Sequence, residues 1–219
     1  MQILNFFKKP IDLNQKPLSW QNKDVTIILD NGHGKDCAGK RSPKWPDGSQ
    51  LFEWEFNRDI VKRIAEQLKQ CGIKYEILVP EDKDISLEER VKRANKIWKK
   101  TNKKCFIVSV HANAGGGTGW EVWTSVGKTK SDDIAQVFWN EMKSEFPTQK
   151  MRLDMTDGDI DKEKNFYILY KSSCPAILTE NFFMDNEKDC KEILMKSLMR
   201  QKIANAHVNA IKKTLMNLY

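Results

Sequence analysis

Two of the chain's three histidines lie at or shortly after the ends of apolar runs, and so does one glutamate. His33 stands in "DNGHGKD" after "VTIIL", His111 follows "CFIVSV", and Glu180 follows "PAILT". If these runs are parallel strands, their carboxyl ends meet at one sheet edge, where open α/β sheets bind ligands. Two neutral imidazoles and one carboxylate, together with a water, form a common catalytic zinc site. The pattern therefore predicts a metal site at this edge.

A further protein ligand has two candidates in "LFEWEFNRD", Glu53 and Glu55. Helical spacing places Glu53 with Phe56 and Ile60 on the face toward the core, whereas Glu55 falls on the polar face. An inward carboxylate with no basic partner is costly unless it binds a metal or accepts hydrogen bonds. We therefore expect Glu53 to be the ligand and Glu55 to face solvent.

Each of these residues also has an ordinary structural interpretation. His33 fits a plain turn, His111 a hydrogen-bonded histidine at a strand end, and Glu180 a solvated carboxylate. These interpretations become less favoured when taken together, because each would require its residue to lie at the same sheet edge as the other two by chance. We expect His207, at the edge of an apolar helical face, to be structural. Cys37 is less favoured as a ligand, since two histidines and a glutamate already supply the protein's share of a catalytic site.

The elements that must position these residues alternate along the chain. Apolar runs predict strands at 25–30, 74–80, 105–110, 119–125, 166–170 and 176–182. Helices are predicted at about 52–70, 86–100, 131–146 and 187–217, and 147–164 is predicted to be irregular. This order predicts a single-domain α/β fold, phosphorylase/hydrolase-like, with a mostly parallel or mixed six-stranded sheet and helices on both faces. Residues 1–24 are predicted to be an N-terminal extension and 25–219 the catalytic domain.

Composition excludes a disordered chain, because 40% of the 219 residues are hydrophobic and 31% charged. A formal net charge of +7 favours an anionic partner. The lysines are scattered without a run of five or six, so no basic arm is indicated and nucleic acid is not expected as a partner. The cysteines indicate neither a disulfide framework nor a cysteine zinc site, since none forms a C-x-x-C pair: Cys37, Cys71, Cys105, Cys174 and Cys190.

Taken together, the motifs resemble the zinc-dependent N-acetylmuramoyl-L-alanine amidases of the type 3 family, which cut peptidoglycan. The similarity covers about residues 25–215 and rests on "LDNGHGKD", "EWEFN", "LEERVKRAN", "VSVHANA" and "PAILTENFFMDN". The resemblance implies that His33, Glu53 and His111 bind Zn²⁺ and that Glu180 is the catalytic acid/base. The implied reaction is hydrolysis of the amide between N-acetylmuramic acid and L-alanine, with peptidoglycan as the partner.

The sequence departs from the family pattern at two positions. Asn31 stands where the family usually has proline, and Asn181 where it usually has glycine. Neither side chain is expected to bind metal. Asp30 or Asn113 is expected to orient the histidines or contact substrate.

Two other functions remain open at this point. One is a zinc peptidase that cuts elsewhere in the stem peptide, and the other is a non-catalytic module that binds anionic polymers through its positive charge. We also expect a monomer without membrane insertion, because no stretch approaches the ~20 apolar residues that span a bilayer. No signal peptide is seen. A phage or prophage lysin is therefore expected, made in the cytoplasm and acting on the cell wall after release; a host wall enzyme is the alternative.

Overall fold

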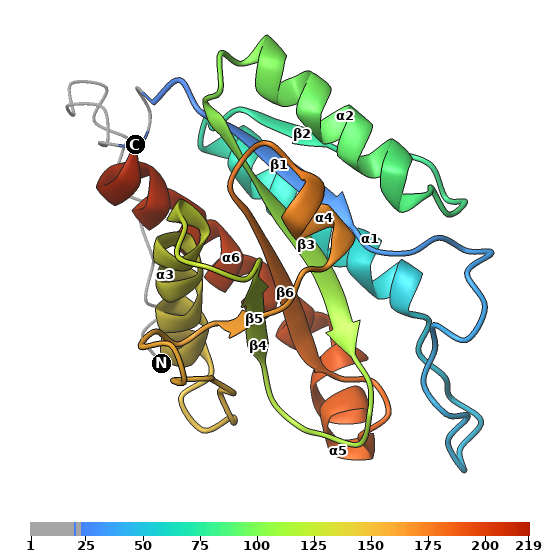
Figure 1. The fold of residues 1–219 in the computed structure, drawn as a ribbon. Helices are drawn as coiled ribbons and strands as arrows, with labels where there is room; N and C mark the ends of the chain where they lie inside the picture. The colour runs from blue at the N-terminus through green and yellow to red at the C-terminus, as the bar shows by residue number, and fades with distance from the viewer. Residues whose placement is uncertain (1–19, 21–22) are drawn as a thin grey trace, which may run out of the picture.

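Alternating apolar strands and amphipathic helices fold around one six-stranded sheet with the order β2-β1-β3-β6-β4-β5 (Figure 1). The protein is described by a computed structural model that covers Trp20 and residues 23–219. Most of the predicted extension, 1–24, lies outside these described residues. The strands are β1 (Thr26–Asn31), β2 (Tyr75–Ile77), β3 (Cys105–Asn113), β4 (Glu121–Thr124), β5 (Lys162–Glu163) and β6 (Ala176–Phe183). The predicted mixed sheet is confirmed, since β4 runs antiparallel to β6.

Helices cover both faces of the sheet, as predicted (Figure 1). The first face carries α1 (Glu53–Gln70), α3 (Lys130–Glu145) and α6 (Ser197–Leu218). The second carries α2 (Leu87–Lys100) and α4 (Tyr167–Lys171). Side chains of β1 alternate between the two cores, with Ile27 and Leu29 in one and Ile28 in the other. Burial on both faces is the reason that the central strands are apolar throughout.

The strand register brings the predicted site residues to one edge. Asn31 at the end of β1 pairs with Val110 of β3, and His111 pairs with Glu180 of β6. The loop after β1 and the ends of β3 and β6 therefore meet. The antiparallel β4 contributes its first residue instead, because Glu121 pairs with Glu180 from the other side.

Three local predictions were wrong. Residues 166–170 were predicted as a strand, but 167–170 belong to helix α4, which buries Ile168 and Leu169. A five-residue apolar run fits either structure. Two polar residues of the predicted irregular segment form β5. The predicted helix 187–217 is divided into α5 (Glu187–Asp189), a π-helical turn η1 (Cys190–Leu194) and α6. Lys196 is extended at the division, where neither proline nor glycine signals a break.

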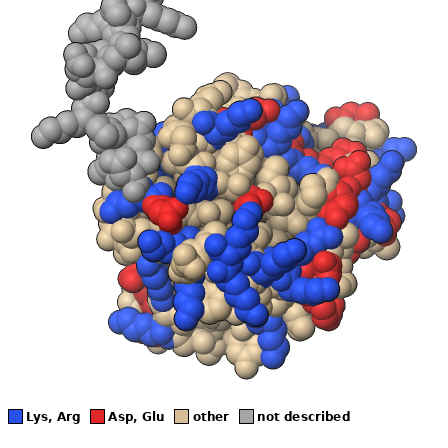
Figure 2. All heavy atoms as spheres, turned by 90° about the horizontal axis from the view of Figure 1, so that it is seen from above, with Lys and Arg blue, Asp and Glu red and all other residues tan. Residues whose placement is uncertain are grey.

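Many of the lysines that look scattered in the sequence gather at the edge where the parallel strands begin, opposite the predicted site. Figure 2 looks down on this edge and shows a broad basic face. Its exposed lysines lie at strand starts and the neighbouring helix ends: Lys69, Lys74, Lys99, Lys100, Lys103, Lys104, Lys128, Lys130 and Lys171. None of the helices in the described part of the chain is long and apolar enough to cross a membrane.

Candidate active site

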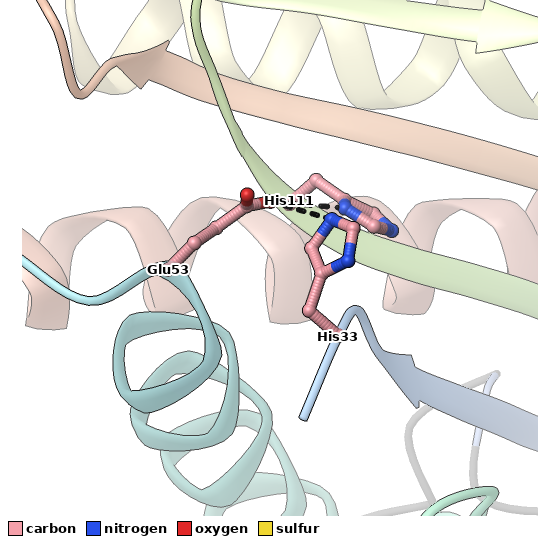
Figure 3. A group of neighbouring side chains, drawn as sticks. All are labelled: His33, Glu53 and His111. Atoms are coloured by element: carbon pink, nitrogen blue, oxygen red, sulfur yellow. Dashed lines mark hydrogen bonds and ion pairs between the residues drawn. The ribbon is translucent and has the colours of Figure 1, made fainter. Parts of the chain in front are cut away.

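Three side chains from three different elements converge at the edge where β1 and β3 end (Figure 3). Glu53 is the first residue of α1, His33 lies in the loop after β1, and His111 lies near the end of β3. The Glu53 Oε1 atom is 3.4 Å from His33 Nε2 and 3.1 Å from His111 Nδ1. One donor atom from each residue lies within 4.8 Å of the other two. Two imidazole nitrogens and a carboxylate oxygen at this spacing fit a divalent metal ion.

Electrostatics couple these three residues. Burial acts to raise the pKa of Glu53, but the hydrogen bonds and charges of His111 and His33 outweigh it and hold that pKa well below its ordinary value. Burial acts to lower the pKa of His111, but the hydrogen bond and charge of Glu53 raise it overall. Glu53, which is only 2% exposed, is therefore an ionised carboxylate held between the two imidazoles.

Two arginines and an asparagine fix the backbone that carries His33. Its φ of +59° is uncommon for a residue with a side chain. Arg58 Nη1 donates to the His33 carbonyl at 2.8 Å, and Asn57 Nδ2 donates to the Gly32 carbonyl at 3.0 Å. Arg90 Nη1 donates to the carbonyl of residue 31 at 2.9 Å. Three consecutive carbonyls are thus held by α1 and α2, which sustains the unusual conformation.

Both glycines beside His33 are required by close approach. A Cβ at Gly32 would lie 2.1 to 2.5 Å from the His111 imidazole. A Cβ at Gly34 would lie 1.9 Å from the backbone nitrogen of Asp84. The sequence "GHG" therefore lets the first histidine loop pass directly against the second histidine.

Glu180 lies beside the three convergent residues, and all four line one cavity of about 610 Å³. Burial raises the pKa of Glu180 to about 8; the charges of Glu53 and Glu121 add to this effect, while His111 opposes it. Its Oε2 atom is buried and has no hydrogen-bond partner among the described residues. The carboxyl group is therefore free to exchange a proton with a bound molecule.

Asp30 and Asn113 line the cavity, but neither hydrogen-bonds to a histidine. Asp30 accepts from Arg90 Nη1 and Ser109 Oγ, each at 2.6 Å. It therefore acts on the His33 loop indirectly, through the arginine that holds residue 31. The Asn113 amide donates to Glu121 at 2.8 Å.

The remaining candidates occupy the places that the spacing indicates. Glu55 is exposed on α1. His207 is fully buried and structural, with Nδ1 2.8 Å from the Ile203 carbonyl and Nε2 3.1 Å from Thr179 Oγ1. The Cys37 thiol lies 3.6 Å from His33 Nδ1, the ring nitrogen that does not face Glu53. Cys37 thus contacts the side of the His33 ring that is turned away from Glu53.

The two departures from the family pattern have structural roles. Asn31 donates to the Val79 carbonyl at 3.1 Å, which ties the end of β1 to the residues after β2. The Asn181 amide donates to the His111 carbonyl at 2.9 Å and accepts from Trp120 Nε1 at 2.9 Å. Asn181 thus braces the strand that carries His111.

Sequence reasoning missed Glu121. It is 3% exposed and contacts Asn113, Trp123, Arg152 and Lys162. Its position in "GWEVW", between large apolar residues of an alternating strand, was the available signal.

The family model for N-acetylmuramoyl-L-alanine amidases matches residues 27–213. A sporulation-specific N-acetylmuramoyl-L-alanine amidase of Bacillus subtilis is 28% identical over 86% of this chain and 68% of its own length. The endolysin of Bacillus phage SPP1 is 30% identical over 86% of this chain and 65% of its own length. The crystal structure of an N-acetylmuramoyl-L-alanine amidase from Clostridium difficile 630 covers 89% of this chain and 98% of its own, with a TM-score of 0.75 and 26% identity. The chain belongs to the N-acetylmuramoyl-L-alanine amidase family, whose members are hydrolases.

Proposed function

We propose that this protein is a zinc-dependent enzyme that hydrolyses the amide between N-acetylmuramic acid and L-alanine in peptidoglycan. The observation that carries the proposal is the convergence of His33, Glu53 and His111 beside Glu180 in one cavity. Family membership supplies the bond that is cut.

The ligands in this proposal are His33, Glu53 and His111, and the donor set matches that of catalytic zinc sites, which leave a position open for water or substrate. When bound, zinc supplies Lewis acidity that polarises the substrate carbonyl and makes water a better nucleophile at neutral pH. Glu180 then accepts the proton of the attacking water and delivers it to the leaving amine of L-alanine. A pKa near 8 suits both transfers, because the ideal catalytic pKa lies near the working pH.

Digestion of purified peptidoglycan, followed by mass spectrometry of the soluble products, tests the bond that is cut. We expect intact stem peptides that begin with L-alanine, and no such release after the metal is stripped with a chelator. Readdition of Zn²⁺ should restore the release. Shortened stem peptides would instead show a peptidase.

Glu180→Gln tests the acid/base role separately from metal binding. The amide keeps the size of the side chain but cannot accept the proton, so we expect kcat to fall by about 10²- to 10⁴-fold. Zinc stoichiometry, measured by metal analysis, should remain that of the unaltered protein. Glu55→Gln is the matched control, because it removes a carboxylate from the same protein at an exposed position. Retained activity in Glu180→Gln would contradict the assignment.

We further propose a role in phage-type lysis of the cell wall, supported by the similarity to a phage endolysin. Production of the protein inside a bacterium should leave cells intact until a membrane-permeabilising agent is added, and lysis should then follow. Glu180→Gln, produced in the same way, should not lyse cells. Lysis without permeabilisation would argue for a different route to the wall.

A further inference from the structure

A second, smaller pocket is lined by three basic side chains. It has a volume of about 360 Å³ and is lined by Lys150, Met151, Arg152, Leu153 and Lys162. No acidic side chain is among these lining residues. Three basic side chains around one pocket fit an anionic group.

A buried carboxylate holds two of these cations in place. Glu121 Oε2 accepts from Arg152 Nε and from Lys162 Nζ, the latter at 3.1 Å. The other oxygen, Oε1, accepts from Asn113 at 2.8 Å and from Trp123 at 3.0 Å. Glu121 is therefore fully satisfied and balances only one of the two cations that it binds.

The charge that remains is available to a ligand. In the described part of the chain, the guanidinium of Arg152 makes no other hydrogen bond, and Lys150 forms no ion pair. Arg152 and Lys162 keep 30% and 20% of their side chains exposed, so the cations are fixed in position yet accessible. Fixed cations lose less entropy on binding an anion than free surface side chains.

The pocket lies within reach of the bond proposed to be cut. Glu180 on β6 pairs with Glu121 on β4, and Trp123 of β4 pairs with Lys162 of β5. Neighbouring strands are about 4.8 Å apart, so two strand steps separate Glu180 from Lys162 by about 10 Å. Arg152 binds the carboxylate of Glu121, which pairs directly with Glu180. An extended peptide advances about 3.5 Å per residue. A carboxylate on the residue after L-alanine therefore reaches the cations once their side chains are included.

We propose that Arg152, Lys162 and Lys150 form a subsite for a substrate carboxylate, so that the enzyme prefers acidic stem peptides with a free carboxylate on the residue after L-alanine. This inference rests on the proposed function. Arg152 and the lysines determine specificity in it and do not take part in bond cleavage.

Two synthetic N-acetylmuramoyl tripeptides that differ in one group test the subsite. One carries D-glutamate with a free carboxylate after L-alanine, and the other carries the corresponding amide. We expect kcat/KM to be about tenfold higher for the acid, since a hydrogen bond to a charged group is worth that much. In Arg152→Gln the ratio of acid to amide should fall to about one, and Lys150→Gln, which leaves Glu121 fully paired, should lower it partway.

Lys128→Gln is the matched control, because it removes one positive charge from the opposite edge of the sheet. It should keep the ratio of the unaltered protein. Equal rates for acid and amide in the unaltered protein, or an unchanged ratio in Arg152→Gln, would overturn the subsite. If neither tripeptide is cleaved, the proposed function fails; calorimetric binding of the acidic and amidated peptides to the same protein then still decides whether the pocket selects a carboxylate.

Discussion

His33 is held in a conformation that side chains rarely adopt, because three consecutive carbonyls around it are bound by α1 and α2. The result is an imidazole whose Nε2 faces Glu53. Metal sites gain affinity when their ligands are oriented in advance by surrounding hydrogen bonds. The interactions that hold this loop are therefore expected to matter for metal affinity as much as for folding.

Gly32→Ala tests this expectation at a single atom. The added methyl group overlaps the His111 ring, so His111 must move away from Glu53. Loss of a partner that orients a ligand typically costs 10- to 100-fold in metal affinity, and we expect a loss of at least about 100-fold here. Competition with a chromophoric chelator measures the zinc affinity.

Gly127→Ala is the matched control, because it makes the same glycine-to-alanine change as Gly32→Ala at a different position. Gly127 has a positive φ, so the variant strains its backbone, but its new Cβ meets no atom within 4 Å. It should lower the melting temperature and leave zinc affinity unchanged. Equal zinc affinity in Gly32→Ala and the unaltered protein would show that the loop and His111 are not sterically coupled.

At the residue scale, spacing was enough to distinguish Glu53 from Glu55, because two residues along a helix turn a side chain to the opposite face. Spacing also explained why two histidines and Glu180 meet. Spacing gave no sign that the guanidinium of Arg58, on the same helix, reaches back to the carbonyl of His33. Such contacts depend on how two elements pack, which a single periodic segment does not encode.

The short strand β5 begins after a buried acidic residue with no ion pair among the described residues. Asp161 is 1% exposed, and burial raises its pKa to about 7 from an ordinary value of 3.8, with repulsion from Asp159 and Asp132 adding to the effect. A hydrogen bond from the Thr124 hydroxyl opposes the shift. The folded state therefore binds this proton more tightly than the unfolded state does.

This shift predicts a pH-dependent stability that Asp161→Asn removes. Because the folded pKa is raised, the stabilising contribution is complete below about pH 4 and is lost as the pH rises through 7. Asparagine carries no charge at any of these values, so the variant should melt about 3 °C or more above the unaltered protein at pH 8. Its advantage should shrink toward pH 5. Melting curves across this range measure both.

The matched control is Asp133→Asn, which neutralises an exposed carboxylate in the first turn of α3. Its melting temperature should differ from that of the unaltered protein by the same amount at pH 5 and pH 8. If the difference in melting temperature between Asp161→Asn and the unaltered protein does not change with pH, Asp161 is ionised in the folded protein throughout this range.

At the element scale, the clearly amphipathic helices and the apolar central strands were predicted correctly, whereas α4, β5 and the division before α6 were not. Helices α1, α2 and α3 carry clear apolar stripes, and the central strands are apolar along their length. Helix α4 and strand β5 are too short to show a period, so tertiary packing decides their structure. At the division before α6, Arg200 donates to the Leu194 carbonyl and to Asp59. These contacts bridge a bend that no local signal in the sequence marks.

Over the whole molecule, the parallel strands bring the chemistry to one edge and a group of exposed lysines to the other. Parallel β1, β3 and β6 end at the histidines and Glu180, while their starts adjoin the lysine-rich helix ends. Helix C-termini favour lysine through their dipole, which accounts for part of this pattern. The sequence predicted the total charge but not its position, since residues far apart in the chain contribute to the basic face.

Adsorption of the protein to purified anionic cell wall should therefore depend on the salt concentration and on the lysines at this edge of the sheet. Replacing Lys99, Lys103 and Lys104 with glutamine should weaken sedimentation with walls at low salt by about tenfold and reduce the dependence on salt. A matched triple variant replaces Lys35, Lys44 and Lys188, which are exposed elsewhere, and loses the same charge. Equal weakening in both variants would show that only the net charge matters.

The separation of charge from chemistry gives the molecule an electric polarity. An anionic surface attracts the lysine-rich edge (Figure 2), whereas the cavity that holds Glu180 lies at the opposite edge of the sheet. We therefore expect the polymer that retains the enzyme to be a different strand from the one that enters the cavity. In a meshwork of strands, the enzyme would rest on one layer and cut across the gap into the next.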